Sequence, residues 1–397
     1  MKSKTLFAGI DWASKTHLVC VVDETGGIRA RFKIANTGKT FAGLVNRLTR
    51  LTAPWSRRCS TPCCGWWSSP HARSRGCTAA TGGSGAKSDA ADAYLLADVL
   101  RTDGHRLRAL TQDSDATAVL RSLTRTRKQL VEARVGLVNQ LQAELERVFP
   151  GAIGLFARLD SDVAIAFLRR YPITVAASRL TKVRLAAFLR RISYSGRKPV
   201  EELFARVHDA PPAGISPEQA EGRAVAVLAL LRAIERVHRE ERELQAEIIE
   251  RLEAHADAHI FTSLPKAGHG VRAATLLAEI GDDRARYPDE ESLAALAGVA
   301  SVTRASGTMT SVGFRWAADK KLRNALIDFA DDSRHASPWA AKVYTDAINR
   351  GKRQTHAVRI LARAWTRVIL ALLARRHQLQ PPTPRRRHGF ERRLRLT

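Results

Sequence analysis

The sequence predicts an α/β domain at the N-terminus, followed by two mostly helical regions. Near the N-terminus, three short apolar or alternating runs separated by turn residues are typical of strands. Farther along, apolar residues recur at helical and heptad spacing, and 397 residues are too many for one ordinary hydrophobic core. We therefore expect an α/β domain over residues 1–110, a long helical region over 111–260, a mostly helical domain over 261–375 and a basic tail over 376–397.

The charge balance indicates a polyanionic partner. The chain has 65 Lys and Arg residues against 39 Asp and Glu, a formal net charge of +26, and a hydrophobic content of 45% that is typical of a folded chain. The last 47 residues contain 13 basic residues and a single acid, Glu391. This pattern favours nucleic acid, although the same sign of charge would suit a ribosomal or membrane-surface protein.

The sequence gives no sign of secretion or membrane insertion. Its apolar runs are shorter than the roughly 18 residues that a membrane span needs, and Met1 to Thr5 lead into a strand rather than a signal-peptide core. Five cysteines are an odd number, and the adjacent pair Cys63 and Cys64 suits neither a disulfide framework nor a zinc site. We expect a cytoplasmic protein with reduced thiols, no structural metal and no membrane partner.

The first strand is expected over residues 5–10 and ends at Asp11, and the second over residues 17–22. Turn residues then precede a third, half-exposed strand over 28–34, in which apolar residues alternate with three basic ones, Arg29, Arg31 and Lys33. The sequence therefore predicts a three-stranded meander, followed by a helix over 41–51.

The composition changes abruptly after this helix. From Thr52 to Ala86 there is no Leu, Ile, Val, Met or Phe, although the stretch holds four of the five cysteines and three of the seven tryptophans. There is also no acidic residue from Thr25 to Ser88. Because no strand or helix there could bury an aliphatic face, we predict that residues 52–83 are read out of frame from a GC-rich gene, which resequencing the coding DNA would test.

The middle region predicts two long helices. Leu123, Leu130 and Leu137 recur every seven residues, and the run stops at Phe149. The second run starts near Ser216 and keeps heptad spacing, with a charged residue at one seam position, in the set Val227, Leu230, Ile234, Val237, Glu241, Leu244 and Ile248. The two stripes could pair with each other or form a dimer seam. Between them, mixed short helices are expected over 162–211.

The C-terminal region contains a glycine-containing turn over 264–270, which includes Lys266 and resembles the turns that approach DNA phosphates in helix-hairpin-helix motifs. A plain helix–helix turn is the alternative. Helices are expected over 272–280 and 293–299, followed by a hydroxyl-rich loop over 301–311. A basic run follows, and two further helices carry Trp339 and Trp365.

Three carboxylates are candidates for metal chemistry. Asp11 closes the first strand, where a ribonuclease-H-like sheet places its first metal ligand, and Asp89 and Asp92 lie about one turn apart at a helix start. Magnesium ions that act on phosphodiesters need oxygen ligands that converge from separate elements. Ordinary capping of the helix by Ser88 or Asp89 is the alternative.

Four motifs in this order resemble the DEDD transposases of the insertion-sequence one-ten family. They lie at residues 9–15, 85–93, 264–282 and 296–307, and the resemblance covers most of the chain except 52–83. It implies a RuvC-like N-terminal domain with four acidic residues, a helical coiled-coil middle and a C-terminal transposase domain with a nucleophilic serine. It further implies a recombinase that cuts and joins DNA, with Mg²⁺ at its acidic site and a structured guide RNA.

Carried over residue by residue, Asp11 matches the first acid, Asp89 and Asp92 the closing pair, and Ser306 the serine. A serine hydroxyl needs a nearby metal or base, and cations to hold the phosphate. The basic candidates for this role are Lys266, Arg304, Arg315, Lys320, Lys321 and Arg323. A homo-oligomer is expected. The family's second acid, a Glu, is absent from its interval, so we predict weak metal binding and impaired recombination.

Two other functions fit parts of the sequence. An actin-like or sugar-kinase ATPase also begins with a strand that ends in Asp, but its phosphate loop requires Gly and Thr where Trp12 and Ala13 stand here. ATP hydrolysis without DNA would favour it. A non-enzymatic nucleic-acid-binding protein would need only a basic surface and paired helices, and would keep its cellular function in Asp11→Ala and Ser306→Ala variants.

Overall fold

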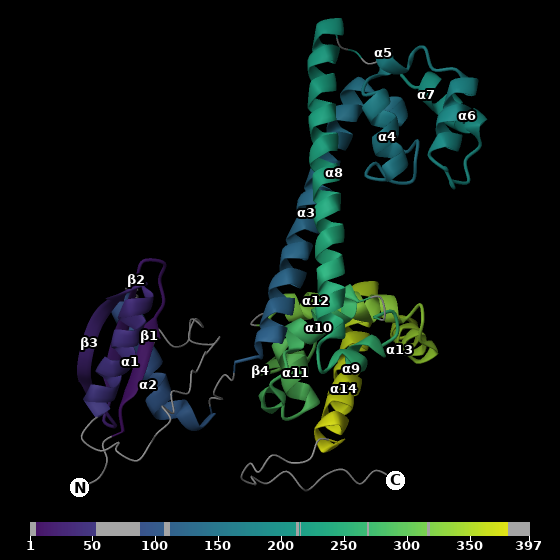
Figure 1. Cartoon of the computed structure of the whole chain (residues 1–397). Helices are drawn as coiled ribbons and strands as arrows, with labels where there is room; N and C mark the ends of the chain where they lie inside the picture. The colour runs from purple at the N-terminus through teal and green to yellow at the C-terminus, as the bar shows by residue number, and fades with distance from the viewer. Residues whose placement is uncertain are drawn as a thin grey trace. The chain divides into compact units, whose positions relative to one another are not determined.

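The structure is a computed structural model that describes residues 5–52, 88–106, 112–211, 214, 216–267, 270–315 and 318–379 (Figure 1). The chain divides into two compact units. The first comprises residues 1–113, 282–331 and 342–397, and the second comprises residues 114–281 and 332–341. The segment 52–83, apart from Thr52, and the basic tail from residue 380 lie outside the described residues, as do four of the five cysteines. Cys20 is buried with a free thiol.

The N-terminal sheet is the predicted three-stranded meander. Strands β1 (Phe7–Asp11), β2 (Thr16–Val22) and β3 (Ile28–Ala35) are antiparallel and lie in the order β1-β2-β3. In the β2–β3 turn, the Asp23 carboxylate accepts hydrogen bonds from the hydroxyl and the backbone N–H of Thr25 and from the N–H of Gly27. These bonds, together with Arg29, hold the pKa of Asp23 well below its usual range.

One helix packs on each face of this sheet (Figure 1). Helix α1 (Gly38–Thr52) contributes Leu44 to a cluster with Val19 and Ile34, and helix α2 (Asp89–Asp103) contributes Ala93 and Ala97 to a cluster with strand residues on the other face. The period of two along each strand explains why β2 feeds both clusters.

Helix α2 touches the backbone of β1 at Gly9. A β-carbon at Gly9 would lie 2.1 Å from the carbonyl oxygen of Ala93 and 2.5 Å from the backbone nitrogen of Ala97. Only glycine permits so close an approach of helix to strand. The close packing of α2 on β1 therefore explains why the motif over 9–15 begins with glycine.

Replacing Gly9 by alanine should destabilise this sheet by about 3 kcal/mol, because the clash involves helix backbone that cannot rotate away. Gly43→Ala is the matched control: a β-carbon at Gly43 meets nothing within 4 Å, so alanine should stabilise α1 by about 0.8 kcal/mol. Hydrogen exchange of the β1 and β2 amides measures both effects. Equal protection in the two variants would contradict the close packing of α2 on β1.

The second unit is built on two long helices, α3 (Asp115–Val148) and α8 (Pro217–Glu253), which pack against each other (Figure 1). They run antiparallel, because Arg127 contacts Gln245 near one end and Arg223 contacts Glu144 near the other. In α8, Val227, Ile234 and Ile248 of the predicted stripe are buried; in α3, Leu123, Leu130 and Leu137 are half-buried. The two helices therefore pair within the chain. The buried row of α3 is not the predicted stripe but a neighbouring row that includes Leu120, Thr124, Leu141, Leu145 and Val148.

Four short helices connect α3 to α8, in agreement with the prediction for 162–211. They are α4 (Asp162–Arg170), α5 (Thr174–Ala177), α6 (Lys182–Arg191) and α7 (Val200–His208). Phe149, Phe156 and Phe188 surround Phe167 with ring centroids 5.8 to 6.2 Å apart, and this aromatic cluster forms the core of the connection.

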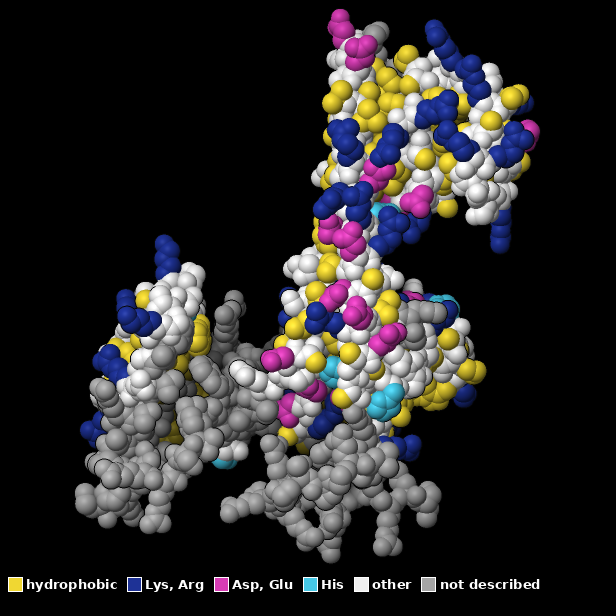
Figure 2. Space-filling model, viewed as in Figure 1, with side chains coloured by type: hydrophobic (Ala, Val, Ile, Leu, Met, Phe, Trp, Pro, Cys, Tyr) yellow, Lys and Arg dark blue, Asp and Glu magenta, His cyan; other side chains and the backbone are white. Residues whose placement is uncertain are grey.

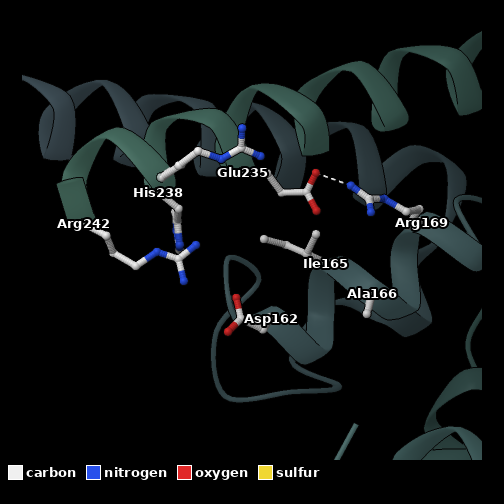
Figure 3. A pocket seen from close by; sticks show the side chains of 8 residues that line it. Asp162, Ile165, Ala166, Arg169, Glu235, His238 and Arg242 are labelled. Carbon is white, nitrogen blue, oxygen red and sulfur yellow. Dashed lines mark hydrogen bonds and ion pairs between the residues drawn. The ribbon is translucent and has the colours of Figure 1, made fainter. Parts of the chain in front are cut away.

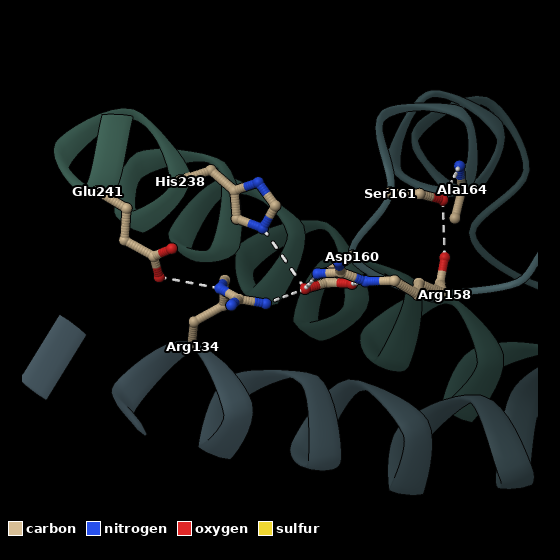
Figure 4. A network of polar contacts seen from close by, with 7 residues as sticks. All are labelled: Arg134, Arg158, Asp160, Ser161, Ala164, His238 and Glu241. Atoms are coloured by element: carbon tan, nitrogen blue, oxygen red, sulfur yellow. Dashed lines mark hydrogen bonds and ion pairs between the residues drawn. The ribbon is translucent and has the colours of Figure 1, made fainter. Parts of the chain in front are cut away.

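A buried polar network joins this connection to the long helices (Figure 4). Arg134 of α3 contacts both Asp160 and Glu241, with 2.9 Å between its Nε and the Glu241 carboxylate. Glu241, the charged residue within the predicted apolar stripe of α8, is therefore paired. Arg158 donates two hydrogen bonds to Asp160, which is 4% exposed. Arg158 first, and Arg134 after it, outweigh the effect of burial and lower the pKa of Asp160 to about 2.

Asp160→Asn should therefore destabilise the helical unit by about 2 kcal/mol at neutral pH. A carboxyl whose pKa is lower in the folded state stabilises above its unfolded value, so the difference between wild type and variant should be full above about pH 4 and vanish as the pH falls to about 2. Hydrogen exchange of α4 measures it. Glu235→Gln, which breaks the exposed pair with Arg169, is the control and should cost below about 1 kcal/mol. A pH-independent difference for Asp160→Asn would contradict this assignment.

The remaining helices follow α8. Helices α9 (Ala258–Thr262) and α10 (Val271–Ile280) belong to the second unit, where Arg125 of α3 forms a bidentate pair with Glu279 at 2.7 and 2.8 Å. Helices α11 (Glu290–Leu296), α12 (Lys320–Ser333), α13 (Pro338–Asn349) and α14 (Gln354–Leu379) complete the part of the chain that the structure describes. Phe329 packs edge-on against the buried Trp365 at 5.0 Å. None of the described helices is both long enough and apolar enough to cross a bilayer.

The prediction of a loop over 301–311 is wrong. Residues Ser301–Ser306 form strand β4 and Met309–Phe314 form β5, an antiparallel hairpin with a two-residue turn. Gly307, at a φ of 58°, takes the first turn position, where two-residue hairpins favour glycine. The β-branched residues Val302, Thr303 and Thr310 favour strand, and the abundance of Ser, Thr and Gly concealed this pattern in the sequence.

Candidate functional site

Asp11 lies on the face of the sheet that α2 covers. It is the last residue of β1 and alternates with Phe7 and Gly9, which contact α2. Arg101, near the end of α2, donates to the carbonyl oxygen of Glu24 at 3.3 Å, so that end of the helix lies at the β2–β3 turn. The N-terminal end of α2 therefore lies at the opposite end of the strands, where β1 ends.

The first turn of α2 carries the other two predicted carboxylates. Ser88 is the N-cap, and its hydroxyl accepts a hydrogen bond from the N–H of Ala91 at 3.2 Å. Asp89 is exposed and Asp92 is half-buried. Ser88 therefore caps the helix, as one of the two alternatives predicted. The first turn of α2, with Asp89 and Asp92, lies at the same end and on the same face of the sheet as Asp11. We call these three residues the acidic end.

Carboxylate oxygens are suitable ligands for a hard divalent cation. However, the described residues contain no group of three or more His, Cys, Asp or Glu side chains arranged to hold a metal. The interval from Asn36 to Ser88, which would supply a fourth ligand, contains no acidic residue. The donor type of the acidic end therefore fits a divalent cation, and its donor number falls short of a complete site.

Two further basic side chains, on β3, lie on the same face of the sheet. Asp11 pairs with Leu18 and Leu18 pairs with Lys33, so Lys33 is in the same row of the sheet, two strands or about 10 Å away. Arg31 lies in the next row with Gly9, and both basic side chains are exposed. Arg29, by contrast, is engaged with Asp23. The alternation of apolar and basic residues in β3 could be predicted from the sequence, but the alignment of Lys33 with Asp11 depends on the register of the three strands.

The segment after Asp11 is held in place by backbone contacts. The N–H of Ala13 donates to Nδ1 of the buried His17 at 3.1 Å, and Asn36 donates to the carbonyl oxygens of Ser14 and Lys15 at 3.1 and 3.0 Å. The ring of Trp12 lies over His17 with 4.4 Å between centroids. These contacts fix the end of β1, and with it the backbone that carries Asp11.

Ser306 belongs to a different element. It is the last residue of β4, pairs with Met309 and is exposed. A β-carbon at the neighbouring Gly307 would meet nothing within 4 Å, so the surroundings of the turn are open. The hairpin thus presents the predicted serine at its tip.

The basic candidates differ in what they contact. Lys320 and Lys321 are exposed in the first turn of α12, which Asp319 caps by accepting from the N–H of Lys321 at 2.9 Å. Arg323 instead donates to the carbonyl oxygens of Ala297 and Arg315 at 3.3 and 2.9 Å. It therefore ties the end of the hairpin to α11, a structural contact that the sequence did not indicate.

Lys266 is exposed at a positive φ of 63°, and its carbonyl oxygen accepts a hydrogen bond from Arg272. Arg315 is half-buried. The side chain of Arg304 lies outside the described part of the chain, and so do Gly268 and His269 of the predicted phosphate-binding turn and Trp316 of the basic run.

The helical unit has a polar pocket of its own (Figure 3). Its volume is about 310 Å³, and α4 and α8 line it with Asp162, Ile165, Ala166, Arg169, Glu235, His238, Arg239 and Arg242. None of the predicted site residues lines it. On the face shown in Figure 2, Lys and Arg side chains gather over the short helices, whereas acidic side chains mix with them along α8.

Comparison with known proteins agrees with these motifs. Residues 71–150 match the family model described as a DEDD transposase of IS110, and residues 258–345 match the transposase IS116/IS110/IS902 family. The first range includes Asp89 and Asp92 but not Asp11. It also includes residues 71–83, which belong to the segment 52–83 that is predicted to be read out of frame. The second range includes Ser306.

Curated relatives cover most of the chain. The IS117 mini-circle protein of Streptomyces coelicolor is 31% identical over 383 residues, which is 90% of this chain and 91% of that protein. An IS110 protein of the same organism is 31% identical over 72% of this chain and 71% of its own length. An IS900 protein of Mycobacterium paratuberculosis is 30% identical over 75% of this chain and 73% of its own. The chain therefore belongs to the IS110 family of insertion-sequence transposases.

Proposed function

We propose that this chain is the DNA recombinase of an insertion sequence, in which the acidic end and Ser306 act on the same phosphodiester. The observation that carries the proposal is the contact of α2 with β1 at Gly9, which supports a common location for Asp11 and the aspartates of α2. Family membership supports DNA as the substrate. An actin-like ATPase has no support from the family matches.

In the proposed reaction, Oγ of Ser306 attacks the phosphorus of a DNA phosphodiester. A bond forms between Oγ and phosphorus, the bond to one sugar oxygen breaks, and that oxygen takes up a proton while Ser306 loses one to a carboxylate or water. A sugar hydroxyl of a second strand then loses its proton and attacks the phosphorus of the DNA–serine phosphodiester. The bond between Oγ and phosphorus breaks, and Ser306 regains a proton. A divalent cation held by Asp11, Asp89 and Asp92 would stabilise the charge on the phosphate.

The basic residues hold the nucleic acids in this proposal. Lys33 and Arg31 lie in position to contact phosphates beside the acidic end, and Lys320 and Lys321 do so beside the hairpin. The net charge of +26 also supports binding of a structured guide RNA, which the family resemblance implies. The chain acts as a homo-oligomer, and the α3–α8 pair forms a coiled-coil arm.

We further propose that this copy binds Mg²⁺ weakly and recombines slowly, because no acidic residue follows β3 before Asp89. The test is strand exchange by the purified full chain on duplex DNA of the element's ends, with Mg²⁺ or with EDTA. Slow exchange that EDTA abolishes is expected. Rapid Mg²⁺-dependent exchange would refute the impairment, and exchange that is insensitive to EDTA would refute the role of the acidic end.

The missing acid favours one second candidate, a nucleic-acid-binding protein without catalysis. It predicts tight binding to the same DNA and no exchange under any metal. Cellular function that survives both Asp11→Ala and Ser306→Ala would establish it.

A further inference from the structure

Both faces of the β4–β5 hairpin carry exposed side chains, and Val302 is half-buried. Thr303 and Ala305 alternate with Ser306 along β4, and all three are exposed, as are Thr310 and Ser311 of β5. A β-carbon at Gly313 would meet nothing within 4 Å. A two-stranded hairpin alone is at best marginally stable in water. This ribbon is therefore a surface that is suited to a partner.

The base of the ribbon is anchored, whereas its tip is open. Arg323 donates to the carbonyl oxygen of Arg315, directly after β5, at 2.9 Å. Gly298, at a φ of 64°, allows this arrangement, because a β-carbon there would lie 2.4 Å from the Arg323 guanidinium and 2.6 Å from Ala318. At the tip, Met309 is 72% exposed. The ribbon is thus held at one end and projects at the other.

The chemistry of the ribbon matches DNA. No acidic residue occurs from Ser301 to Ala318, and exposed Lys320 and Lys321 follow. Ser and Thr hydroxyls donate to and accept from base edges and phosphates, and methyl groups of Thr and Met contact the thymine methyl. Its hydroxyl side chains are Ser301, Thr303, Ser306, Thr308, Thr310 and Ser311.

We infer that the β4–β5 ribbon enters the major groove of B-form DNA. Two strands about 4.8 Å apart, with side chains on both sides, fit a groove about 12 Å wide. The major groove of an A-form RNA duplex is too narrow and deep for side chains to read, so duplex RNA is excluded as the occupant. The inference deepens the proposed function, on which it rests for the role of Ser306, because it brings DNA to the element that carries that hydroxyl.

The test uses the full chain and three duplex probes of one sequence. These are unmodified DNA, DNA in which glucosylated 5-hydroxymethylcytosine fills the major groove, and RNA. Filling the groove should weaken DNA binding about tenfold or more, guanine N7 methylation should interfere, and Thr310→Asp should leave RNA binding unchanged. Equal binding of the two DNA duplexes, an equal loss of RNA and DNA binding in Thr310→Asp, or displacement by the minor-groove ligand netropsin with no effect of glucosylation, would overturn the inference.

Charge variants locate the contact. Thr310→Asp should weaken DNA binding about tenfold, because it places a carboxylate among phosphates. Thr345→Asp, at an exposed position of α13, is the matched control and should leave binding nearly unchanged. Thr310→Val keeps the strand preference without the hydroxyl, and hydrogen exchange of the ribbon amides should slow on DNA binding in this variant too. Unchanged exchange would count against the ribbon.

Ser306→Ala separates the two ideas. Its DNA binding should keep the same sensitivity to groove filling, and it should lose strand joining. Loss of groove sensitivity in wild type would refute the ribbon alone, whereas strand joining by Ser306→Ala would refute the proposed nucleophile alone.

Discussion

Ser306→Ala should reduce covalent protein–DNA joining by about 10³-fold or more, because it removes the oxygen that forms the bond to phosphorus. The sensitive measurement is a single-turnover assay for a denaturant-resistant adduct between protein and DNA. Peptide mass spectrometry of the adduct should place the phosphodiester on Ser306.

Thr345→Ala is the matched control, since Thr345 is an exposed hydroxyl residue on α13, outside the ribbon. It should form adduct at the wild-type rate. An adduct of normal yield in Ser306→Ala, or one mapped to another residue, would remove Ser306 from the mechanism while leaving the fold of the hairpin as described.

Asp11→Asn should lower the same reaction about a hundredfold or more, because it removes a negative ligand where β1 meets the first turn of α2. The side chain keeps its size, so the sheet should stay folded. Adduct formation measured against Mg²⁺ concentration should show a higher half-saturating concentration.

Asp98→Asn is the control for charge on the same helix. Asp98 pairs with Arg101 toward the other end of α2, with 2.7 Å between nitrogen and oxygen. Its loss should change the reaction by less than about twofold, since this pair lies toward the end of α2 opposite Asp89 and Asp92. Equal losses in the two variants would indicate a general charge effect instead of a site at Asp11.

Much of the fold could be predicted from local pattern. The alternation in Ile28–Ala35 defines β3, and the spacing of Val227, Ile234 and Ile248 defines the buried stripe of α8. The β4–β5 hairpin was missed because its serines, threonines and glycines are also typical of loops, and the cross-strand pairing that decides the matter is not a local property.

The candidate site could be predicted only in part. Asp11, Asp89 and Asp92 were found from their element ends, but their common face depends on Gly9, where a long-range contact determines the residue. Lys33 needed the strand register to align it with Asp11. Arg323 was expected to contact phosphate, and its hydrogen bonds to two carbonyl oxygens depend on a tertiary contact that the sequence does not contain.

The central claim is that Asp11 and the aspartates of α2 bind one divalent cation together. A double-mutant cycle on Mn²⁺ affinity, measured by electron paramagnetic resonance on the full chain, tests it most directly. Asp11→Asn and Asp89→Asn should each remove most of the binding, and the double variant should bind no more weakly than either single one. Losses that simply add, or Mn²⁺ affinity unchanged by Asp11→Asn, would contradict the claim.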